Sequence, residues 1–469
     1  MELLPYIDFK IKKPIYIQIY DYIKNEILEG KIKTDEKLPS IRLLAENLNI
    51  SKTTVEAAYT QLIMEGYVES KPHRGYFTKF VEKYDVETEN MVKSSVDYEV
   101  NSVSSTKSID LCAAPISIWK KSYNQVMREC PEVFTSYGEV QGSKLLRIEL
   151  MNYLHRSRGV NCDVNQIIIG SGVQDLLTLL VMILGENVKI VGIEEPGFRK
   201  ASKRFEDLGL KICPIEVENS MLIKNIQKEK DLDLLYLTPS HQFPMGQVMP
   251  IAKRIEVLRW AIDNDTYIIE DDYDSELRYK GNPIPSLQGI DKSGRVIYIS
   301  SISKVLTPAI RISYMVLPKT LCKLYESKRD RYSQTASSID QIVLANIMRE
   351  GNFEKHIRRI RKIYSRKNEI LILSLKKIFG DDVDIVGQET GLNILVKFNG
   401  IKRKIDENTN WNNNNMTLTP LDYYYYSKKD IKKTKYFLLS YAGVSDEEIE
   451  NNIEKLREWI KLDKKYQKL

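Results

Sequence analysis

The sequence predicts an α/β protein with a mainly parallel central sheet, flanked by a small N-terminal domain and a smaller C-terminal α+β lobe. Residues 164–317 alternate short apolar runs with helical patterns, as parallel strands joined by crossover helices do. Residues 14–80 combine three helical patterns with a hairpin pattern. Residues 81–108 are polar and charged, which is typical of a flexible linker. We therefore expect one domain in residues 1–80 and a larger one in residues 109–469.

Composition narrows the class of protein. The chain has 469 residues, of which 42% are hydrophobic, and a formal net charge of +6 at pH 7. It contains no apolar run of the length that a membrane span needs, and its first residues lack the apolar core of a secretory signal. Its five cysteines are scattered and lack CxxC spacing, which is typical of reduced thiols in the cytoplasm. Since the chain also has only four histidines, we expect no metal site, and we expect no membrane contact.

The N-terminal unit has the pattern of a winged helix-turn-helix. Apolar residues recur at helical spacing from Pro14 to Glu29, and Ser40 and Ser51 stand where the caps of two further helices would be. Two short strand patterns, residues 67–70 and 75–78, follow the third helix. Three helices and a hairpin in this order are typical of a class of DNA-binding domains.

Short polar and cationic side chains in this unit are candidates for DNA contact. The third helix begins Ser-Lys-Thr-Thr, and this end would point into a major groove. The candidates are Arg42, Ser51, Lys52, Thr53, Thr54 and, at the tip of the hairpin, Arg74. Residues 1–80 hold 12 lysines and arginines against 11 acidic residues, so DNA contact requires a local patch. The alternative is that this small domain docks onto another protein.

One lysine of the larger domain lies between two strand-like runs. Small hydroxyl residues, among them Ser301 and Ser303, flank Lys304, and Arg311 follows before the next apolar run. Burial lowers the pKa of a lysine, and a neutral amine condenses with an aldehyde. Hydroxyls and a guanidinium are suited to holding a phosphate nearby. The alternative is an ordinary loop lysine beside a serine-rich turn.

Two further stretches favour the chemical interpretation. An apolar strand pattern ends in the carboxylates of residues 270–274, and strand ends of this kind are where open α/β sheets bind ligands. Asp271 is placed to hold a pyridine nitrogen protonated, and Tyr273 to reach a phenolic oxygen of the same ring. Upstream, a Gly-Ser-Gly turn ending at Gly172 separates a strand pattern from a helix pattern, which predicts an anion site at the helix N-terminus.

Together these residues resemble the fold-type I family of pyridoxal 5′-phosphate (PLP) enzymes, in its aspartate aminotransferase branch. The resemblance covers the chain from about Ile109 to its end. It implies that Lys304 is the Schiff-base lysine, Asp271 the partner of the pyridinium nitrogen and Tyr273 a ligand of the ring hydroxyl. It also implies a cofactor site completed by Gly172, Val173, Gln174, Ser301, Ser303 and Arg311 around the phosphate and by Phe198 against the ring.

Two departures from the aminotransferase pattern bear on function. Aminotransferases of this kind carry Asn-Pro-Thr-Gly where this chain has Phe243-Pro-Met-Gly, so His241 or Gln242 would have to replace the asparagine beside the ring oxygen. They also carry an arginine that grips the substrate α-carboxylate, at the position that aligns with Leu438. Because a leucine cannot form this contact, the sequence argues against ordinary transamination of an α-amino acid.

The N-terminal unit resembles the DNA-binding domain of the GntR family of bacterial regulators. The match runs over residues 14–77 and includes Leu-Pro-Ser-Ile-Arg42 and the Gly-Tyr-Val-Glu-Ser70 wing. A GntR-type head, a linker and an aminotransferase-like domain together resemble the MocR subfamily of transcriptional regulators. This resemblance implies a homodimer that binds double-stranded promoter DNA. Our hypothesis is that PLP on Lys304 acts as effector or cofactor, and an amino-acid-like molecule is a further candidate effector.

Three hypotheses for the larger domain follow. Leu438 favours a sensor of PLP itself, controlling vitamin B6 synthesis. The presence of Lys304, Asp271 and Tyr273 allows a second hypothesis, an active PLP-dependent aminotransferase with a regulatory DNA-binding head. In the third, the PLP domain is only a dimerisation scaffold.

Overall fold

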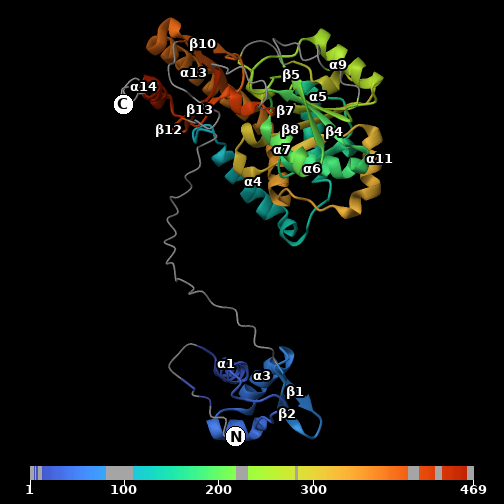
Figure 1. Cartoon of the computed structure of the whole chain (residues 1–469), viewed down its shortest axis with the longest axis vertical. Coiled ribbons are helices and arrows are strands. Elements are labelled where there is room, and N and C mark those ends of the chain that lie inside the picture. Colours follow the sequence, from blue (N-terminus) through green and yellow to red (C-terminus); the bar gives the residue numbers. More distant parts are fainter. Residues whose placement is uncertain are drawn as a thin grey trace. The chain divides into compact units, whose positions relative to one another are not determined.

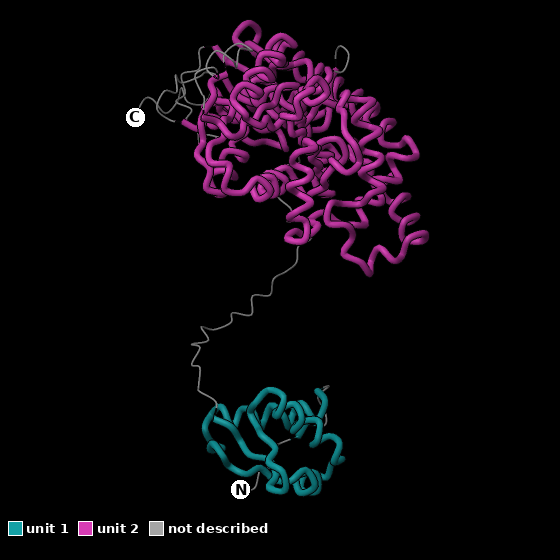
Figure 2. Tube along the Cα trace, turned by 90° about the vertical axis from the view of Figure 1, so that its right-hand side faces the viewer, with its two compact units in different colours: residues 1–102 teal, residues 103–469 magenta. Residues whose placement is uncertain are grey.

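The chain divides into two compact units, residues 1–102 and residues 103–469 (Figure 2). The computed structural model describes residues 13–80, 109–217, 231–279, 284–399, 411–427 and 436–461, together with residues 5, 7, 8 and 226. The predicted linker, residues 81–108, lies outside the described residues.

The N-terminal unit is a winged helix-turn-helix, as the sequence predicts. Its described helices are α1 (Ile15–Leu28), α2 (Ile41–Leu48) and α3 (Lys52–Met64), and its wing is the antiparallel hairpin of β1 (Val68–Lys71) and β2 (Gly75–Thr78). Ser40 and Ser51 cap α2 and α3, because each hydroxyl oxygen accepts a hydrogen bond from a backbone N–H of the first turn. One face of each helix contributes to a single apolar core, which includes Ile19, Ile23, Leu44, Val55, Tyr59 and Leu62.

The larger unit is built on a sheet for which the structure describes seven strands, in the order β3-β9-β8-β7-β6-β4-β5. From the N-terminus they are β3 (Ile167–Gly170), β4 (Ile190–Glu195), β5 (Lys211–Glu216), β6 (Leu234–Leu237), β7 (Tyr267–Asp272), β8 (Val296–Ser301) and β9 (Ser313–Val316). β9 runs antiparallel to both of its neighbours, whereas the other adjacent strands pair in parallel. The predicted mainly parallel sheet is therefore confirmed.

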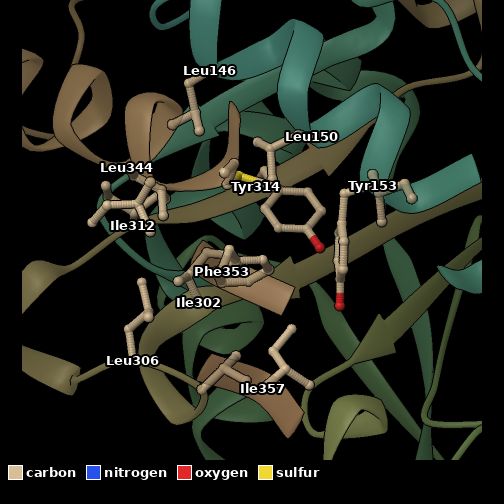
Figure 3. Packing of buried hydrophobic residues seen from close by; sticks show 14 of the residues in the cluster. Leu146, Leu150, Tyr153, Ile302, Leu306, Ile312, Tyr314, Leu344, Phe353 and Ile357 are labelled. Atoms are coloured by element: carbon tan, nitrogen blue, oxygen red, sulfur yellow. The ribbon is translucent and has the colours of Figure 1, made fainter. Parts of the chain in front are cut away.

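Helices cover both faces of this sheet (Figure 1). They are α4 (Ile116–Glu129), α5 (Lys144–Arg158), α6 (Val173–Leu184), α7 (Arg199–Asp207), α9 (Ile251–Asp263), α10 (Leu287–Ile290), α11 (Lys319–Lys328), α12 (Ser338–Arg349) and α13 (Asn352–Phe379). Successive residues of a strand face opposite sides, so one core forms with α6, α7 and α11 and another with α5, α12 and α13. Figure 3 shows the second core, where Tyr314 of β9 lies among Leu150 of α5 and Phe353 of α13.

The C-terminal lobe is smaller and antiparallel, as expected for an α+β unit. In the described residues its sheet has the order β10-β11-β14-β13-β12. Its strands are β10 (Val383–Val386), β11 (Asn393–Phe398), β12 (Trp411–Asn413), β13 (Met416–Pro420) and β14 (Tyr436–Ser440), and α14 (Asp446–Lys461) follows them. Helix α14 and the end of α13 pack on one face of this sheet through apolar side chains. The described part of the chain contains no helix that is both long and apolar enough to cross a membrane.

The helical region after Pro318 differs from the prediction in one respect. Its pattern predicts one helix over residues 321–350, but the structure has two, α11 and α12. Polar residues between them contact the large lobe instead of continuing the helix: Thr335 donates to Asp175 Oδ2, and Gln334 donates to a backbone carbonyl at Val140. Ser337 then caps α12. The cap and these contacts explain the break, which a helical pattern of apolar residues does not reveal.

Candidate functional site

A cavity of about 240 Å³ lies where strands of the central sheet end. The carboxyl ends of β7 and β8 meet because these strands are parallel neighbours, and α6 begins at the same edge. All the residues that the sequence predicts for PLP line this cavity: Gly172, Val173, Gln174, Phe198, Asp271, Tyr273, Ser301, Ser303, Lys304 and Arg311. Lys200, Thr238 and Phe243, which were not among the predicted PLP residues, line it as well. The structure therefore brings the predicted residues together, while their roles stay predictions.

Lys304 follows the end of β8 in a short 3-10 turn. Its Nζ lies over the ring of Tyr273, 4.3 Å from the ring centroid. Burial lowers the pKa of Lys304 below that of an ordinary lysine, and the charges of Asp274 and Asp271 oppose this shift. A lowered pKa increases the neutral fraction of the amine, which is the form that attacks an aldehyde.

Asp271 presents one free carboxylate oxygen to this region. Its Oδ2 accepts a hydrogen bond from the Tyr236 hydroxyl of β6, while its buried Oδ1 has no hydrogen-bond partner among the described residues. Burial raises the pKa of Asp271 to about 7, against the opposing effects of Tyr236 and Lys304. A buried acceptor without a partner is costly, and a protonated pyridine nitrogen would satisfy it.

The other carboxylates of residues 270–274 have different partners. Glu270 accepts hydrogen bonds from two backbone N–H groups at the start of α10. Asp272 forms an ion pair with Arg158, with 2.7 Å between Oδ2 and Nε. Asp274 contacts His241. All of these carboxylates are buried, and Asp271 is the one that lines the cavity.

At the other end of the cavity, a helix N-terminus and a guanidinium lie close together. Gly172 immediately precedes α6, and a Cβ atom added to it would lie 2.4 Å from Arg311 Nη2. A side chain at position 172 would therefore displace the Arg311 guanidinium from the first turn of α6. The Arg311 side chain is exposed and forms no ion pair with the described residues. Free N–H groups of the first turn and an unpaired guanidinium are suited to a phosphate, so this end also fits PLP.

His241 and Gln242, the two candidates to replace the aminotransferase asparagine, have different contacts. His241 Nδ1 lies 2.9 Å from Tyr273 Oη. Gln242 donates instead to the backbone carbonyls of Pro196, which follows β4, and of its neighbour Phe243. His241 is therefore the one that contacts the predicted ring-oxygen ligand.

An apolar cluster surrounds Leu438, the residue at the position predicted for a carboxylate-binding arginine. Leu438 of β14 is 5% exposed and packs with Leu395 and Leu421. Phe243 and Met245 of the large lobe pack against the same cluster. The position where the aminotransferase pattern predicts a guanidinium is therefore buried and apolar.

A second cavity, of about 420 Å³, also includes Lys304. It lies between the turn after β8 and the small lobe, and its polar lining consists of neutral side chains apart from Lys304. Those side chains are Ser303, Asn393, Asn415, Thr417 and Ser440. Lys304 thus lines both the cavity of about 240 Å³, which includes Arg311, and a neutral polar cavity.

The residues predicted for DNA contact lie at the surface of the N-terminal unit. Thr54 is half-buried, and Arg42, Ser51, Lys52, Thr53 and Arg74 are exposed. Arg42 forms an ion pair with Glu46 one turn along α2, at 2.9 Å, which the sequence analysis did not anticipate. The Ser51 hydroxyl caps α3, whereas Lys52 has no ion pair with the described residues. Lys52 and Arg74 are therefore the cations most available to a phosphate backbone.

One residue that sequence reasoning missed is Tyr236. It lies in the all-apolar run of β6, and its hydroxyl reaches Asp271 on the neighbouring strand. A tyrosine in a fully buried strand needs a hydrogen-bond partner, and this was the available signal. The described residues contain no group of three or more His, Cys, Asp or Glu side chains suited to a metal ion.

Two protein families match consecutive parts of the chain. Residues 15–78 match the gntR family of bacterial regulatory proteins. Residues 111–456 match aminotransferase class I and II. Among solved structures, a kynurenine aminotransferase from Pyrococcus horikoshii is similar to this chain, with a TM-score of 0.66 and 25% identity over 77% of this chain and 92% of that one. The fold and the site thus define a DNA-binding regulator head joined to an aminotransferase-like domain.

Three relatives of this chain are named as transcriptional regulators or regulatory proteins. The chain is 38% identical to the uncharacterized HTH-type transcriptional regulator YdeL of Bacillus subtilis (strain 168), over 97% of this chain and 99% of the relative. It is 29% identical to the probable rhizopine catabolism regulatory protein MocR of Rhizobium meliloti, over 95% and 93%. It is also 29% identical to the HTH-type pyridoxine biosynthesis transcriptional regulator PdxR of Corynebacterium glutamicum, over 76% and 77%. This chain belongs to the GntR-family transcriptional regulators of the MocR type.

Proposed function

We propose that this regulator binds promoter DNA through its winged helix and holds PLP covalently at Lys304, as the effector or cofactor that controls DNA binding. The observation that carries the proposal is the convergence of the predicted PLP residues on one cavity that includes a lysine of lowered pKa. An unpartnered Asp271 oxygen and an Arg311 guanidinium at a helix N-terminus lie at this cavity. Together they fit the ring nitrogen and the phosphate of PLP.

Each residue has a defined task in this proposal. The Lys304 amine would condense with the aldehyde carbon, and the aldehyde oxygen would leave as water. Asp271 keeps a proton on the ring nitrogen, and Tyr273 donates to the ring oxygen. The start of α6, with Ser301, Ser303 and Arg311, holds the phosphate, and Phe198 packs against the ring. Bound PLP supplies an aldehyde and an electron-withdrawing ring.

Control of DNA binding requires that PLP bind two arrangements of the protein unequally and so shift their populations. The protein acts in the cytoplasm as a homodimer, whose two heads read two half-sites of a promoter. One relative is named a pyridoxine biosynthesis transcriptional regulator, which supports genes of vitamin B6 synthesis as targets. The neutral polar cavity beside Lys304 offers room for a further, amino-acid-like effector.

A binding assay on the DNA that flanks the protein's own gene tests this proposal. The dissociation constant and the footprint are measured with and without PLP, at a fixed salt concentration because phosphate contacts make affinity salt-dependent. We expect PLP to change at least one of them. An unchanged affinity together with an unchanged footprint would contradict the proposal.

The competing function is an active aminotransferase with a regulatory head, and the grouping of Lys304, Asp271 and Tyr273 in one cavity favours it. The apolar cluster around Leu438 argues against it, since an α-carboxylate lacks its arginine there. Incubating the PLP-loaded protein with each amino acid decides between the two. Repeated turnover to a 2-oxo acid would establish the enzyme, whereas the regulator predicts none.

A further inference from the structure

Beside the cavity, a buried histidine contacts the Tyr273 hydroxyl, and a buried carboxylate contacts that histidine. His241 Nδ1 lies 3.0 Å from both carboxylate oxygens of Asp274 and 2.9 Å from Tyr273 Oη. His241 and Asp274 are 6% and 2% exposed. The His241 and Tyr273 rings stack with their centroids 5.6 Å apart. None of these contacts of His241 or Asp274 has a task in the proposed function.

The oxygens around His241 Nδ1 decide where the ring proton lies. A carboxylate only accepts hydrogen bonds, so a nitrogen held close to both Asp274 oxygens carries a hydrogen. This nitrogen then has no lone pair to which the Tyr273 hydroxyl can donate. Tyr273 Oη consequently faces Nδ1 with a lone pair, and its own proton points elsewhere.

The open side of Tyr273 is the cavity that it lines together with Lys304. Burial raises the pKa of Tyr273 well above its usual value, so the hydroxyl keeps its proton. Phe243, at the asparagine position of the aminotransferase pattern, has no polar group to offer a ligand. We propose that His241 and Asp274 form a positioning pair, which fixes the Tyr273 hydroxyl as a donor to the anionic ring oxygen of bound PLP. This inference rests on the proposed function, because PLP supplies that oxygen.

Tight packing keeps the pair in place. A Cβ atom added to Gly391 would lie 2.6 Å from Asp274 Oδ2 and 2.7 Å from His241 Cε1. Gly391 has a φ of +80°, so a larger residue would be strained there as well as too close. Its carbonyl accepts hydrogen bonds from the hydroxyls of Tyr279 and Tyr441. A side chain at position 391 would therefore displace His241 or Asp274.

The tautomer can be measured without any cofactor, and the chain supplies its own control. His356 Nε2 lies 2.7 Å from the carbonyl oxygen of Val305, which only accepts, so this ring carries its proton on Nε2. In the full-length protein with ¹⁵N-labelled histidine, we expect a protonated Nδ1 at His241 and a neutral ring with Nε2–H at His356. The variant His241→Asn assigns the signals. A neutral Nε2–H ring at His241 would overturn the positioning pair, even if PLP binds.

A double-mutant cycle tests whether His241 acts through Tyr273. PLP affinity is measured for His241→Leu, Tyr273→Phe and the double variant, with circular dichroism to verify folding. Losing one hydrogen bond corresponds to about tenfold weaker binding, so we expect about that loss for His241→Leu alone and less than about twofold in the Tyr273→Phe background. His241→Asn keeps an N–H donor and should recover most of the affinity.

The outcomes of this cycle separate the two proposals. An equal loss in both backgrounds would show that His241 acts independently of Tyr273, which contradicts the inference. If the wild-type protein bound no PLP, the proposed function would fail, and the role given to the pair would fail with it. In that case a protonated His241 Nδ1 would still show that the proton arrangement is correct, so the two failures are distinguishable.

Discussion

The two ligand-facing regions of this chain differ in how their side chains are held. In the cavity of the larger unit, Asp271 and Tyr273 have hydrogen-bond partners and lie beside a half-buried Lys304. On the winged helix, Lys52 and Arg74 are exposed to solvent. An interaction in a low-dielectric interior is strong, and a partner left unpaired there is costly, whereas exposed charges each contribute a small share. One substitution in the cavity should therefore abolish or strongly weaken PLP binding, whereas one substitution on the DNA-facing surface should weaken DNA binding only moderately.

The largest effect is expected for Lys304→Ala, which removes the amine itself. PLP followed by borohydride should label wild-type protein at residue 304, and mass spectrometry should find no such label in the variant. The control is Lys200→Ala, because Lys200 lines the same cavity but is exposed. Labelling of the Lys304→Ala protein at full yield would show that PLP capture does not depend on this cavity lysine, which contradicts the prediction.

Asp271→Asn should come next, since it replaces a buried charged acceptor by a neutral one. Hydrogen bonds to charged groups contribute roughly 1.5–3 kcal/mol, so we expect PLP affinity to fall about 10- to 100-fold. Asp291→Asn is the matched control, because that carboxylate accepts backbone N–H groups in the turn before β8, away from the cavity. Equal losses in the two variants would point to a general loss of stability.

Leu438→Arg tests how well the apolar cluster of the larger unit tolerates a charge. It places a charge among Leu395 and Leu421, and burying an unpaired charge costs several kcal/mol. We expect a clearly lower melting temperature than for Leu438→Met, which keeps the site apolar. A Leu438→Arg protein with the melting temperature of the wild type and with turnover of an amino acid would contradict this expectation. It would show that the apolar cluster around Leu438 can accept an arginine.

On the DNA-facing surface, Lys52→Ala should weaken promoter binding by only about 3- to 10-fold and reduce the salt slope by about one, as expected for one lost phosphate contact. PLP capture should not change. Arg42→Ala should have a smaller effect, because Glu46 already pairs with this arginine. If Lys52→Ala abolished DNA binding as completely as Lys304→Ala abolishes the covalent label, the expected difference between the exposed surface and the cavity would be contradicted.

The smallest expected effect is a shift in the pH dependence of the rate of PLP capture. Because burial lowers the pKa of Lys304, its neutral fraction at a given pH exceeds that of an exposed lysine. The rate of PLP capture should therefore rise with pH and level off below the ordinary lysine pKa of 10.5. Stopped-flow absorbance measures this profile, with a lysine-containing peptide as the reference. A profile that coincided with that of the peptide would mean that burial does not tune this amine.

Much of the fold follows from local patterns. Alternating apolar runs predict the parallel sheet, and serine caps predict the starts of α2 and α3. The break between α11 and α12 was missed because it depends on contacts of Gln334 and Thr335 with residues far away in the sequence. Helix α4 was also not anticipated.

The candidate site also contains residues that local motifs predict and residues whose partners are distant in the sequence. The residues predicted for PLP sit in short motifs at strand ends and helix starts, so topology alone brings them to one edge of the sheet. Tyr236 and His241 act across strands and loops, and their partners are set by three-dimensional register. The Arg42–Glu46 ion pair has the i,i+4 spacing of neighbours on a helix, so its signal was present in the sequence.

The central claim is that PLP captured at Lys304 changes how the protein binds DNA. It is tested most directly by titrating promoter DNA with wild-type and Lys304→Ala protein side by side, each with and without PLP. The account predicts a PLP-dependent change in the dissociation constant or footprint for the wild type and no such change for the variant. The same response in both proteins, or in neither, would contradict it.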